Sequence, residues 1–144
     1  MQETIETLWL HGMAFQTEIN GHKIIMDASP SVGGKNLGPR PKPLLLAALG
    51  GCTSMDVISI LSKMKVIPSE YKVSIDAELT EEHPKVYKSI HVTYVIKGPG
   101  FEGNQEILEK VNRAVDLSVT KYCGVSDMLS KAAEITHEIC LLNE

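Results

Sequence analysis

Aromatic residues and basic clusters are scarce in this sequence of 144 residues. Phe, Trp and Tyr together make up 5% of it, and 14 Lys and Arg residues stand against 18 Asp and Glu residues, for a net charge of −4. Nucleic-acid-binding surfaces carry clustered positive charge, and single-strand binding also uses aromatic rings on which bases stack. The composition therefore argues against a nucleic-acid partner and against binding to an anionic membrane.

Cysteine is scarce too, and Cys52, Cys123 and Cys140 form neither a Cys-x-x-Cys pair nor a four-ligand zinc pattern. A chain without a disulfide framework is typical of a reducing compartment. Residues 1–6 are acidic and lack the basic and apolar segments of a signal peptide. We therefore expect a cytoplasmic protein without a metal or other cofactor, in which each cysteine is either packed or reactive.

The longest apolar stretch, residues 44–61, predicts a helix that begins at Pro43 and ends near Met64. Proline suits a first helical position, because its missing N–H would have no partner there in any case. The stretch is apolar or small on nearly every side, which predicts a central helix that is buried all round. Asp56 and several small polar residues interrupt it, and an acid deep in a membrane span is costly. We expect no membrane span.

Two adjacent glycines, Gly50 and Gly51, precede Cys52 in the middle of this predicted helix. Each costs about 1 kcal/mol relative to alanine inside a helix, so the pair indicates that another part of the protein comes close. A cysteine exposed by flanking glycines is a candidate nucleophile. On this helix alone, however, the commoner role for such a cysteine is that of a small buried hydrophobic residue.

Short β-favouring runs lie on both sides of the long helix. Before it, Asn20-Gly21 is a strong hairpin signal, and a loop rich in proline and glycine covers residues 29–41. After it, residues 71–79 and 86–96 alternate between apolar and polar positions and predict a second hairpin. The other expected elements are strands over 5–10, 14–19, 22–27 and 134–142, a helix from Gln105 to about Tyr122 capped by Asn104, and a short helix over 125–131.

This element order favours an α+β fold in one domain over residues 1–144, with antiparallel sheets packed on one side by helices. A chain of this length can bury a sufficient core without disulfides or a metal. The opening strands have few helices of their own to cover them. We therefore expect them to complete the sheet of a partner subunit in an isologous dimer.

The most informative motifs surround the first two cysteines. They are Gly38-Pro39-x-Pro41, the run from Leu44 through Gly50-Gly51-Cys52 to Met55-Asp56-Val57, Lys121-Tyr122-Cys123-x-Val125-Ser126, and the closing Glu134-Ile135-Thr136. Together they resemble the OsmC/Ohr family, the osmotically inducible protein C and organic hydroperoxide resistance proteins. The resemblance covers about residues 12–142 and is closer to the OsmC-like branch than to the Ohr branch. Gly-Gly-Cys followed by a second cysteine about seventy residues later is its most specific part.

The resemblance implies an intertwined homodimer with thiol peroxidase chemistry at the subunit interface. Cys52 would be the peroxidatic cysteine and Cys123 the resolving cysteine: the first becomes a sulfenic acid, the second condenses with it to a disulfide, and a dithiol reductant restores both. The substrate would be a small organic hydroperoxide, which apolar neighbours of the cysteine favour over hydrogen peroxide. The expected substrate-binding residues are Leu45, Leu49, Met55 and Arg40.

The sequence departs from the family pattern in the charges around the reactive cysteine. The family's well-studied peroxidases place an arginine from the N-terminal strands over that cysteine and pair it with a glutamate near the helix start. Residues 1–39 contain no arginine here, and Lys42-Pro43 stands at the place of the glutamate. A thiolate needs a nearby cation or comparable stabilisation to be abundant at neutral pH. The candidate substitutes are Arg40, Lys42 and Arg113.

Asp56, one helical turn after Cys52, would oppose a thiolate there unless it is itself paired. These departures keep a second hypothesis open, in which a non-catalytic protein binds a small apolar ligand at the dimer interface or senses redox state through Cys52. A third hypothesis, a metal site formed by Cys52, Cys123 and a histidine, matches no standard ligand spacing. The rate at which Cys52 reacts with an organic peroxide, compared with a free thiol, distinguishes the first two.

Overall fold

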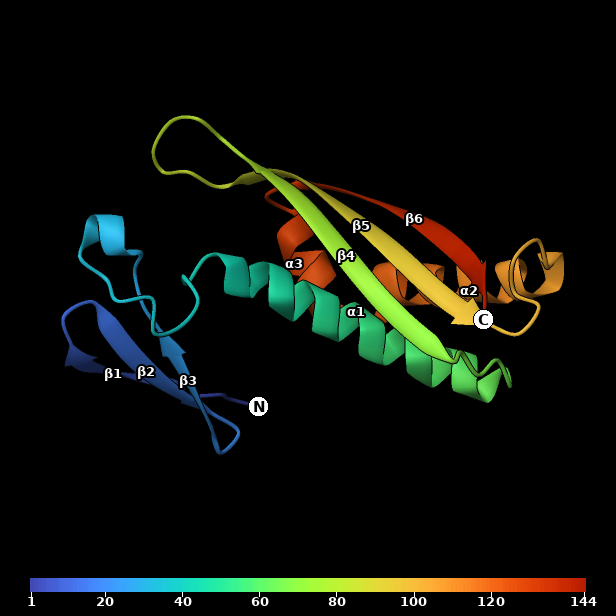
Figure 1. Cartoon of the computed structure of the whole chain (residues 1–144), viewed down its shortest axis with the longest axis horizontal. Helices are drawn as coiled ribbons and strands as arrows, with labels where there is room; N and C mark the ends of the chain where they lie inside the picture. The colour runs from blue at the N-terminus through green and yellow to red at the C-terminus, as the bar shows by residue number, and fades with distance from the viewer. The chain divides into compact units, whose positions relative to one another are not determined.

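The computed structural model describes residues 1–144, and the chain divides into two compact units, Met1–Ala47 and Ala48–Glu144. Each unit contains one three-stranded sheet (Figure 1). The long helix α1 (Pro43–Lys63) begins in the first unit and belongs mostly to the second. The α+β fold class is therefore confirmed, whereas the single domain stays a prediction.

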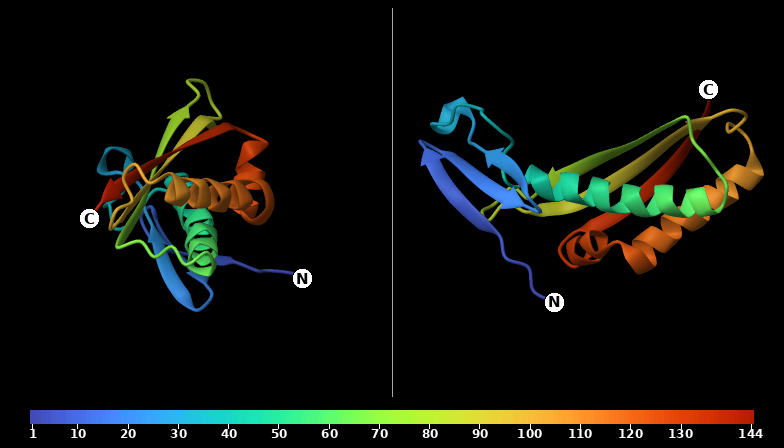
Figure 2. Two further views of the ribbon diagram at one scale, coloured as in Figure 1. Left: turned by 90° about the vertical axis from the view of Figure 1, so that its right-hand side faces the viewer. Right: turned by 90° about the horizontal axis from the view of Figure 1, so that it is seen from below.

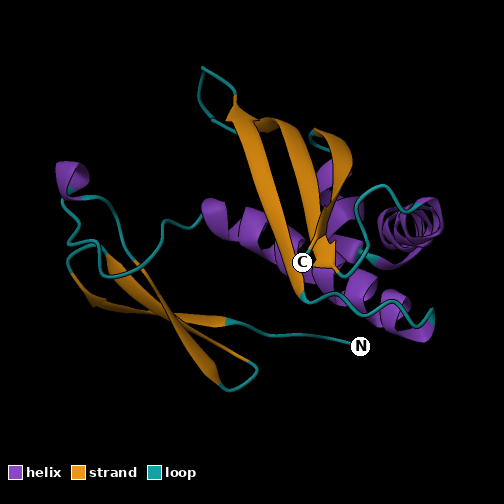
Figure 3. Cartoon of the chain, turned by 45° about the vertical axis from the view of Figure 1, so that its right-hand side comes forward, coloured by secondary structure: helices purple, strands orange, loops and turns teal.

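The first unit is an antiparallel meander in the order β1–β2–β3, whose strands are drawn in orange in Figure 3. Asn20 and Gly21 have φ angles of 52° and 80°, the two positive values that a tight hairpin turn requires and that Asn-Gly accommodates. The predicted hairpin is confirmed. The elements of this unit are β1 (Glu6–His11), β2 (Ala14–Ile19), β3 (His22–Met26) and the single 3-10 turn η1 (Pro30–Val32).

A buried carboxylate organises the loop that follows β3. Asp27 accepts backbone hydrogen bonds from the N–H groups of Ala28 at 2.7 Å and of Lys35 and Leu37 at 3.1 Å each. Burial acts to raise the pKa of Asp27, but these three donors and the charge of Arg40 together hold it below its usual value. The loop is therefore built around an ionised side chain.

The second unit packs three helices on one face of the sheet β4–β5–β6, as the two views of Figure 2 show. The Asn104 side chain accepts a hydrogen bond from the N–H of Ile107 at 3.1 Å, which confirms the predicted helix cap. The elements that follow α1 are β4 (Glu70–Leu79), β5 (Tyr87–Gly98), α2 (Gln105–Leu117), the π-helical turn η2 (Ser118–Tyr122), α3 (Gly124–Ser130) and β6 (Glu134–Asn143).

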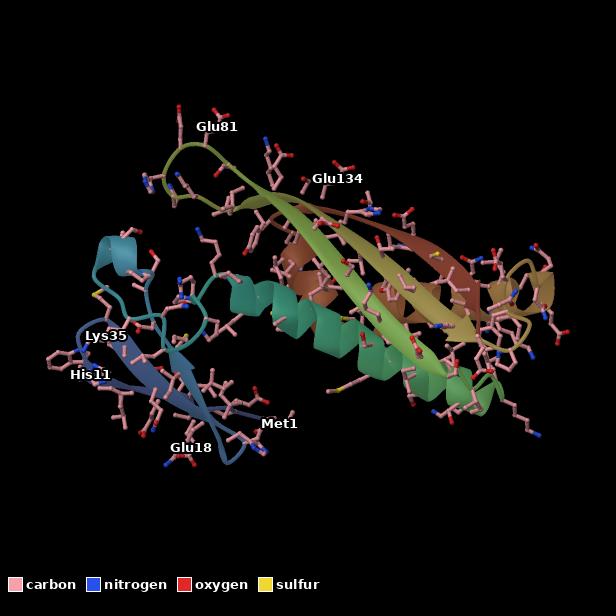
Figure 4. All side chains as sticks on the ribbon, in the orientation of Figure 1. Met1, His11, Glu18, Lys35, Glu81 and Glu134 are labelled. Atoms are coloured by element: carbon pink, nitrogen blue, oxygen red, sulfur yellow. The ribbon has the colours of Figure 1, made fainter.

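Alternate residues of β5 form the centre of the core, because every second side chain of a strand faces the helices. The predicted alternation of this hairpin is confirmed. The loop between β4 and β5 is exposed over residues 81–86, and Figure 4 shows Glu81 projecting from it. The core residues that are at most 3% exposed include Ile90, Val92, Tyr94 and Ile96 from β5, Val57 and Leu61 from α1, and Val111 and Val115 from α2.

One of the two glycines before Cys52 faces β4. A Cβ atom added to Gly50 would lie 3.3 Å from the side chain of Ile75 and 3.5 Å from that of Val73, whereas one added to Gly51 would meet open space. The close approach predicted from the glycine pair is therefore confirmed at Gly50. It lets α1 lie close against β4 just before the cysteine.

The prediction of purely antiparallel sheets is wrong for the last strand. β4 and β5 are antiparallel, but β6 runs parallel to β5, with Ile135 opposite Ile90. A parallel neighbour needs a crossover connection of a dozen or more residues, which α2, η2 and α3 supply. The chain therefore returns to the end of the sheet where β5 begins.

The prediction that α1 is buried all round is also wrong for the single chain. Its buried residues form a stripe at Leu49, Gly50, Thr53, Val57 and Leu61. On other faces Met55 is 76% exposed and Ile58 41% exposed. The helix lies against one sheet, so one stripe carries its packing. Its length and composition alone would suit a membrane span, but core helices of soluble proteins pass the same test.

Candidate functional site

Cys52 and Cys123 come from different elements of the second unit and meet beside an acid. Cys52 lies in the middle of α1, and Cys123 is the N-cap residue of α3. Their Sγ atoms and one carboxylate oxygen of Asp56 all lie within 4.8 Å of one another. Both thiols are free. Because a disulfide bond is about 2.0 Å long, the two sulfurs need to approach by at most about 3 Å to form one.

The backbone holds Cys123 from both sides. In the π-helical turn η2 the N–H of Cys123 donates to the carbonyl oxygen of Ser118 at 2.8 Å. On the other side, the N–H of Ser126 donates to Cys123 Sγ at 3.3 Å. Single π-helical turns are rare and occur frequently at functional sites. The widened turn and the start of α3 together orient this thiol.

The two thiols differ in accessibility. Cys123 is 3% exposed, whereas Cys52 is half-buried. Burial raises the pKa of the Cys123 thiol to about 11, and its contact with Cys52 and the charge of Asp56 act in the same direction, while the N–H of Ser126 opposes them. Cys123 is therefore a neutral thiol at physiological pH, and Cys52 is the sulfur that a solute reaches more easily.

A chain of hydroxyl groups runs from β5 to Asp56. The hydroxyl of Ser118 donates to Asp56 Oδ2 at 2.9 Å. Since a hydroxyl has one proton, the 2.9 Å bond between Thr53 and Ser118 uses the proton of Thr53, and the 2.6 Å bond between Tyr94 and Thr53 uses the phenol proton. Every donor in this hydroxyl chain, Tyr94–Thr53–Ser118, therefore points toward the carboxylate.

The hydroxyl chain lies in the core. Tyr94 and Thr53 are each 1% exposed and Ser118 is 0% exposed. Burial raises the pKa of Tyr94, and the charge of Asp56 adds to the effect, so the phenol remains a donor. The sequence showed Asp56 as an acid that needs a partner, and its partner is the hydroxyl of Ser118 rather than a cation.

The three residues considered as substitutes for the family arginine form no ion pair with Asp56. Arg40, in the first unit, donates to Asn36 Oδ1 at 2.8 Å and to the carbonyl oxygen of Gly38 at 3.0 Å. Lys42 is exposed next to the start of α1, and Arg113 is exposed on α2 in a shallow depression. None of the salt bridges in the chain involves Asp56.

The four expected substrate-binding residues differ in burial. Leu49 is 1% exposed and belongs to the core, whereas Leu45 and Met55 are 48% and 76% exposed. Arg40 lines a mostly apolar cleft of about 540 Å³ within the first unit, beside Phe15. Their contacts with a substrate stay predictions.

Sequence reasoning missed the hydroxyl chain. One signal for it was available, because Ser118 follows Val111, Ala114 and Val115 on the buried stripe of the predicted helix. A polar residue in an apolar stripe needs a hydrogen-bond partner. No comparable signal marks Tyr94, whose ring occupies an ordinary core position of β5.

The cluster of Cys52, Asp56 and Cys123 offers donor types that zinc accepts. However, structural zinc sites use four Cys or His ligands, and the usual catalytic sites include at least one histidine. No histidine belongs to this cluster, so the histidine-containing site considered from the sequence is not formed. The donor set does not fit a standard zinc centre, and we assign no metal to it.

Comparisons with known proteins agree with this architecture. Residues 33–138 match a family model described as OsmC-like protein. Protein YhfA of Escherichia coli strain K12 is 38% identical over 130 residues, which cover 90% of both chains. A structural-genomics structure is 31% identical, with a TM-score of 0.82 over 99% of this chain and 100% of the other. An organic hydroperoxide resistance protein OsmC from Legionella pneumophila shares the fold at 14% identity, with a TM-score of 0.66 and 97% coverage of both chains.

Proposed function

Because the chain belongs to the OsmC-like family, we propose that it is a thiol-dependent peroxidase that reduces organic hydroperoxides. The observation that carries the proposal is the meeting of the Cys52 and Cys123 sulfurs within 4.8 Å. Two free thiols at this separation suit peroxide reduction through a disulfide. The name of the Legionella protein with the same fold refers to resistance to organic hydroperoxides, which supports the same chemistry.

We assign the first step to Cys52 because it is the more accessible thiol. Its sulfur attacks one peroxide oxygen, the O–O bond breaks, and the departing alkoxide takes up a proton to become an alcohol. Cys52 is then a sulfenic acid. The sulfur of Cys123 attacks it, a disulfide forms, and the hydroxide leaves as water after taking up the proton of Cys123. A dithiol reductant restores both thiols by exchange.

The proposal also covers the substrate, the residues that contact it and the assembly of the enzyme. The substrate is a small organic hydroperoxide that contacts Leu45, Leu49, Met55 and Arg40. The enzyme is a cytoplasmic, single-domain homodimer, and exposed apolar side chains support the dimer: Leu8 and Trp9 on β1 are 60% and 67% exposed. Apolar surface of this kind is typical of a subunit interface.

A second candidate function is a non-catalytic protein that binds a small apolar ligand or senses redox state. The raised pKa of Cys123 and the acid beside it favour this alternative, because both conditions disfavour a thiolate. It predicts that Cys52 reacts with a peroxide no faster than a free thiol does.

The test is a count of free thiols, with intact mass, before and after one equivalent of cumene hydroperoxide. We expect rapid loss of two thiols with a Cys52–Cys123 disulfide, and a trapped sulfenic acid in Cys123→Ser. Cys140→Ser is the matched control, since Cys140 is exposed on β6 and outside the cluster, and it should react as the wild type does. Oxidation at the rate of a free thiol would reject the peroxidase and favour the second candidate.

A further inference from the structure

The peroxidase chemistry needs a group that takes a proton from each thiol, because the nucleophile is a thiolate and Cys123 is a neutral thiol. We infer that Asp56 is this group: it accepts the proton of Cys52 as that sulfur attacks the peroxide, and it returns the proton to the departing oxygen. The inference rests on the proposed function and adds a catalytic residue to it. In the family's well-studied peroxidases an arginine lies over the reactive cysteine. In this chain, Asp56 would assist the cysteine as a base instead of as a cation.

The position of Asp56 carries the inference. It lies four residues after Cys52 on α1, so both side chains share one face of the helix. One of its oxygens lies within 4.8 Å of both sulfurs. A general base has to reach its proton directly or through one water, and such contacts are commonly longer before the substrate binds. Among the carboxylates of the chain, Asp56 is the one that forms a cluster with the cysteines.

The hydroxyl chain orients this base. Ser118 donates its single proton to Oδ2 of Asp56, and Thr53 and Tyr94 are aligned behind it. This arrangement fixes one edge of the carboxylate and leaves Oδ1 free to accept a proton from a thiol. Because the Ser118 hydroxyl acts through its hydrogen bond to Asp56, we class Ser118 as a positioning residue.

Both half-reactions balance with this assignment. In the first, Asp56 takes the proton of Cys52, sulfur gives two electrons to the peroxide, and the alkoxide receives the proton from Asp56 as the O–O bond breaks. In the second, Asp56 takes the proton of Cys123, the S–S bond forms, and the hydroxide that leaves Cys52 receives this proton and departs as water. Asp56 ends each half-reaction in its starting state.

No lysine, arginine or histidine nitrogen lies within 4.0 Å of the Asp56 carboxylate. Three titratable groups lie in its cluster or respond to its charge: Cys52 on its own helix, Cys123 at the start of α3, and Tyr94 on β5. Two of these are the reacting thiols, and the third is the end of the hydroxyl chain. In this cluster the carboxylate of Asp56 is the group that can accept a thiol proton.

The two roles that Asp56 can have predict opposite results for Asp56→Asn. If the carboxylate only opposes the thiolates, its removal raises the thiolate fraction and speeds oxidation by cumene hydroperoxide. If it is the base, the rate constant at neutral pH falls by about a hundredfold. The rate then recovers as the pH rises, because hydroxide ionises the thiol directly.

The experiment compares the wild type, Asp56→Asn, Asp56→Glu and Ser118→Ala from about pH 6 to about pH 9, a range over which general-base catalysis is visible. Asp116→Asn, an exposed aspartate on α2, is the matched control and should leave the rate unchanged. Partial activity in Asp56→Glu at neutral pH would support a base, because glutamate keeps the carboxylate. Thermal unfolding of each variant checks that it is folded.

The outcomes separate the two claims. A wild type as slow as a free thiol overturns the peroxidase proposal, and the role of Asp56 with it. A fast wild type with an equally fast or faster Asp56→Asn overturns the role of Asp56 alone. A fast wild type with a slow, pH-restored Asp56→Asn supports both.

Discussion

The two units of the chain bury their apolar residues to very different degrees. In the first unit every residue of β1 is exposed, and Trp9 is 67% exposed. In the second, Ile96 of β5 and Val111 of α2 are 0% exposed. Burial of apolar surface is the main source of stability, so the second unit carries most of the stability of a single chain. The cysteine cluster lies in this unit, where packed neighbours keep its geometry constant.

The largest effect is expected from a cavity in the second unit. Leu61→Ala removes a side chain that is 0% exposed on α1, and we expect the free energy of unfolding to fall by about 2–5 kcal/mol. Chemical denaturation followed by circular dichroism measures this change. Ser62→Ala, at the exposed neighbouring position, is the control and should change it by less than about 0.5 kcal/mol. Equal effects of the two substitutions would contradict the burial contrast.

A smaller loss is expected when the hydroxyl chain is broken. Thr53→Val keeps the side-chain shape but leaves Tyr94 and Ser118 without their shared partner, which should cost about 1–3 kcal/mol of unfolding free energy. The control is Thr120→Val, because the hydroxyl of Thr120 is exposed and bonds only to the carbonyl oxygen of Asp116. The same denaturation experiment compares them. A neutral Thr53→Val would show that the hydroxyl chain adds no stability.

In the first unit, Asp27 makes the free energy of unfolding depend on pH. Its pKa is lower in the folded chain than the unfolded value of about 3.9. The carboxylate therefore stabilises the fold above the unfolded pKa, and this contribution disappears as the pH falls through the folded pKa. We expect the stability difference between the wild type and Asp27→Asn to shrink on acidification below about pH 4. A difference that is constant with pH would contradict an ionised Asp27.

The smallest signal is spectroscopic and tests the exposed β1. Trp9 is the single tryptophan of the chain, so its fluorescence reports on this strand alone. In the proposed dimer a partner subunit covers it, and we expect acrylamide to quench it less in the folded protein than in urea. Dilution to monomer should remove this protection. Equal quenching in the folded and unfolded protein would argue against a covered β1.

The sequence predicted most elements well because their signals are local. Asn20-Gly21 specifies its turn through the φ angles that it permits, and Asn104 marks the start of α2 through a side chain that bonds to the backbone three residues later. The parallel pairing of β6 with β5 was missed because alternation shows that a strand has one buried face but not the direction of its neighbour.

The site was predicted less completely, because its polar half depends on contacts between distant residues. The resemblance pointed to both cysteines, and the spacing of Asp56 from Cys52 was visible in the sequence. Thr53, by contrast, bonds to residues that are 41 and 65 positions away, and only the packing of α1 against β5 and η2 brings them together. The need of Asp56 for a partner was predictable, but the identity of this partner was not.

The π-helical turn η2 makes the number of residues in this segment as important as their chemistry. In η2 the hydrogen bond from Cys123 spans five residues back to Ser118, whereas an α-helical bond spans four. Deleting one residue from 119–122 would restore ordinary helical spacing and turn everything after it by about 100° around the helix axis. Cys123 would then point away from Asp56 although no side chain of the cluster had changed. A relative that keeps both cysteines but has one residue fewer in this turn would therefore have separated thiols. The length of the turn is thus as informative about function as the two cysteines themselves.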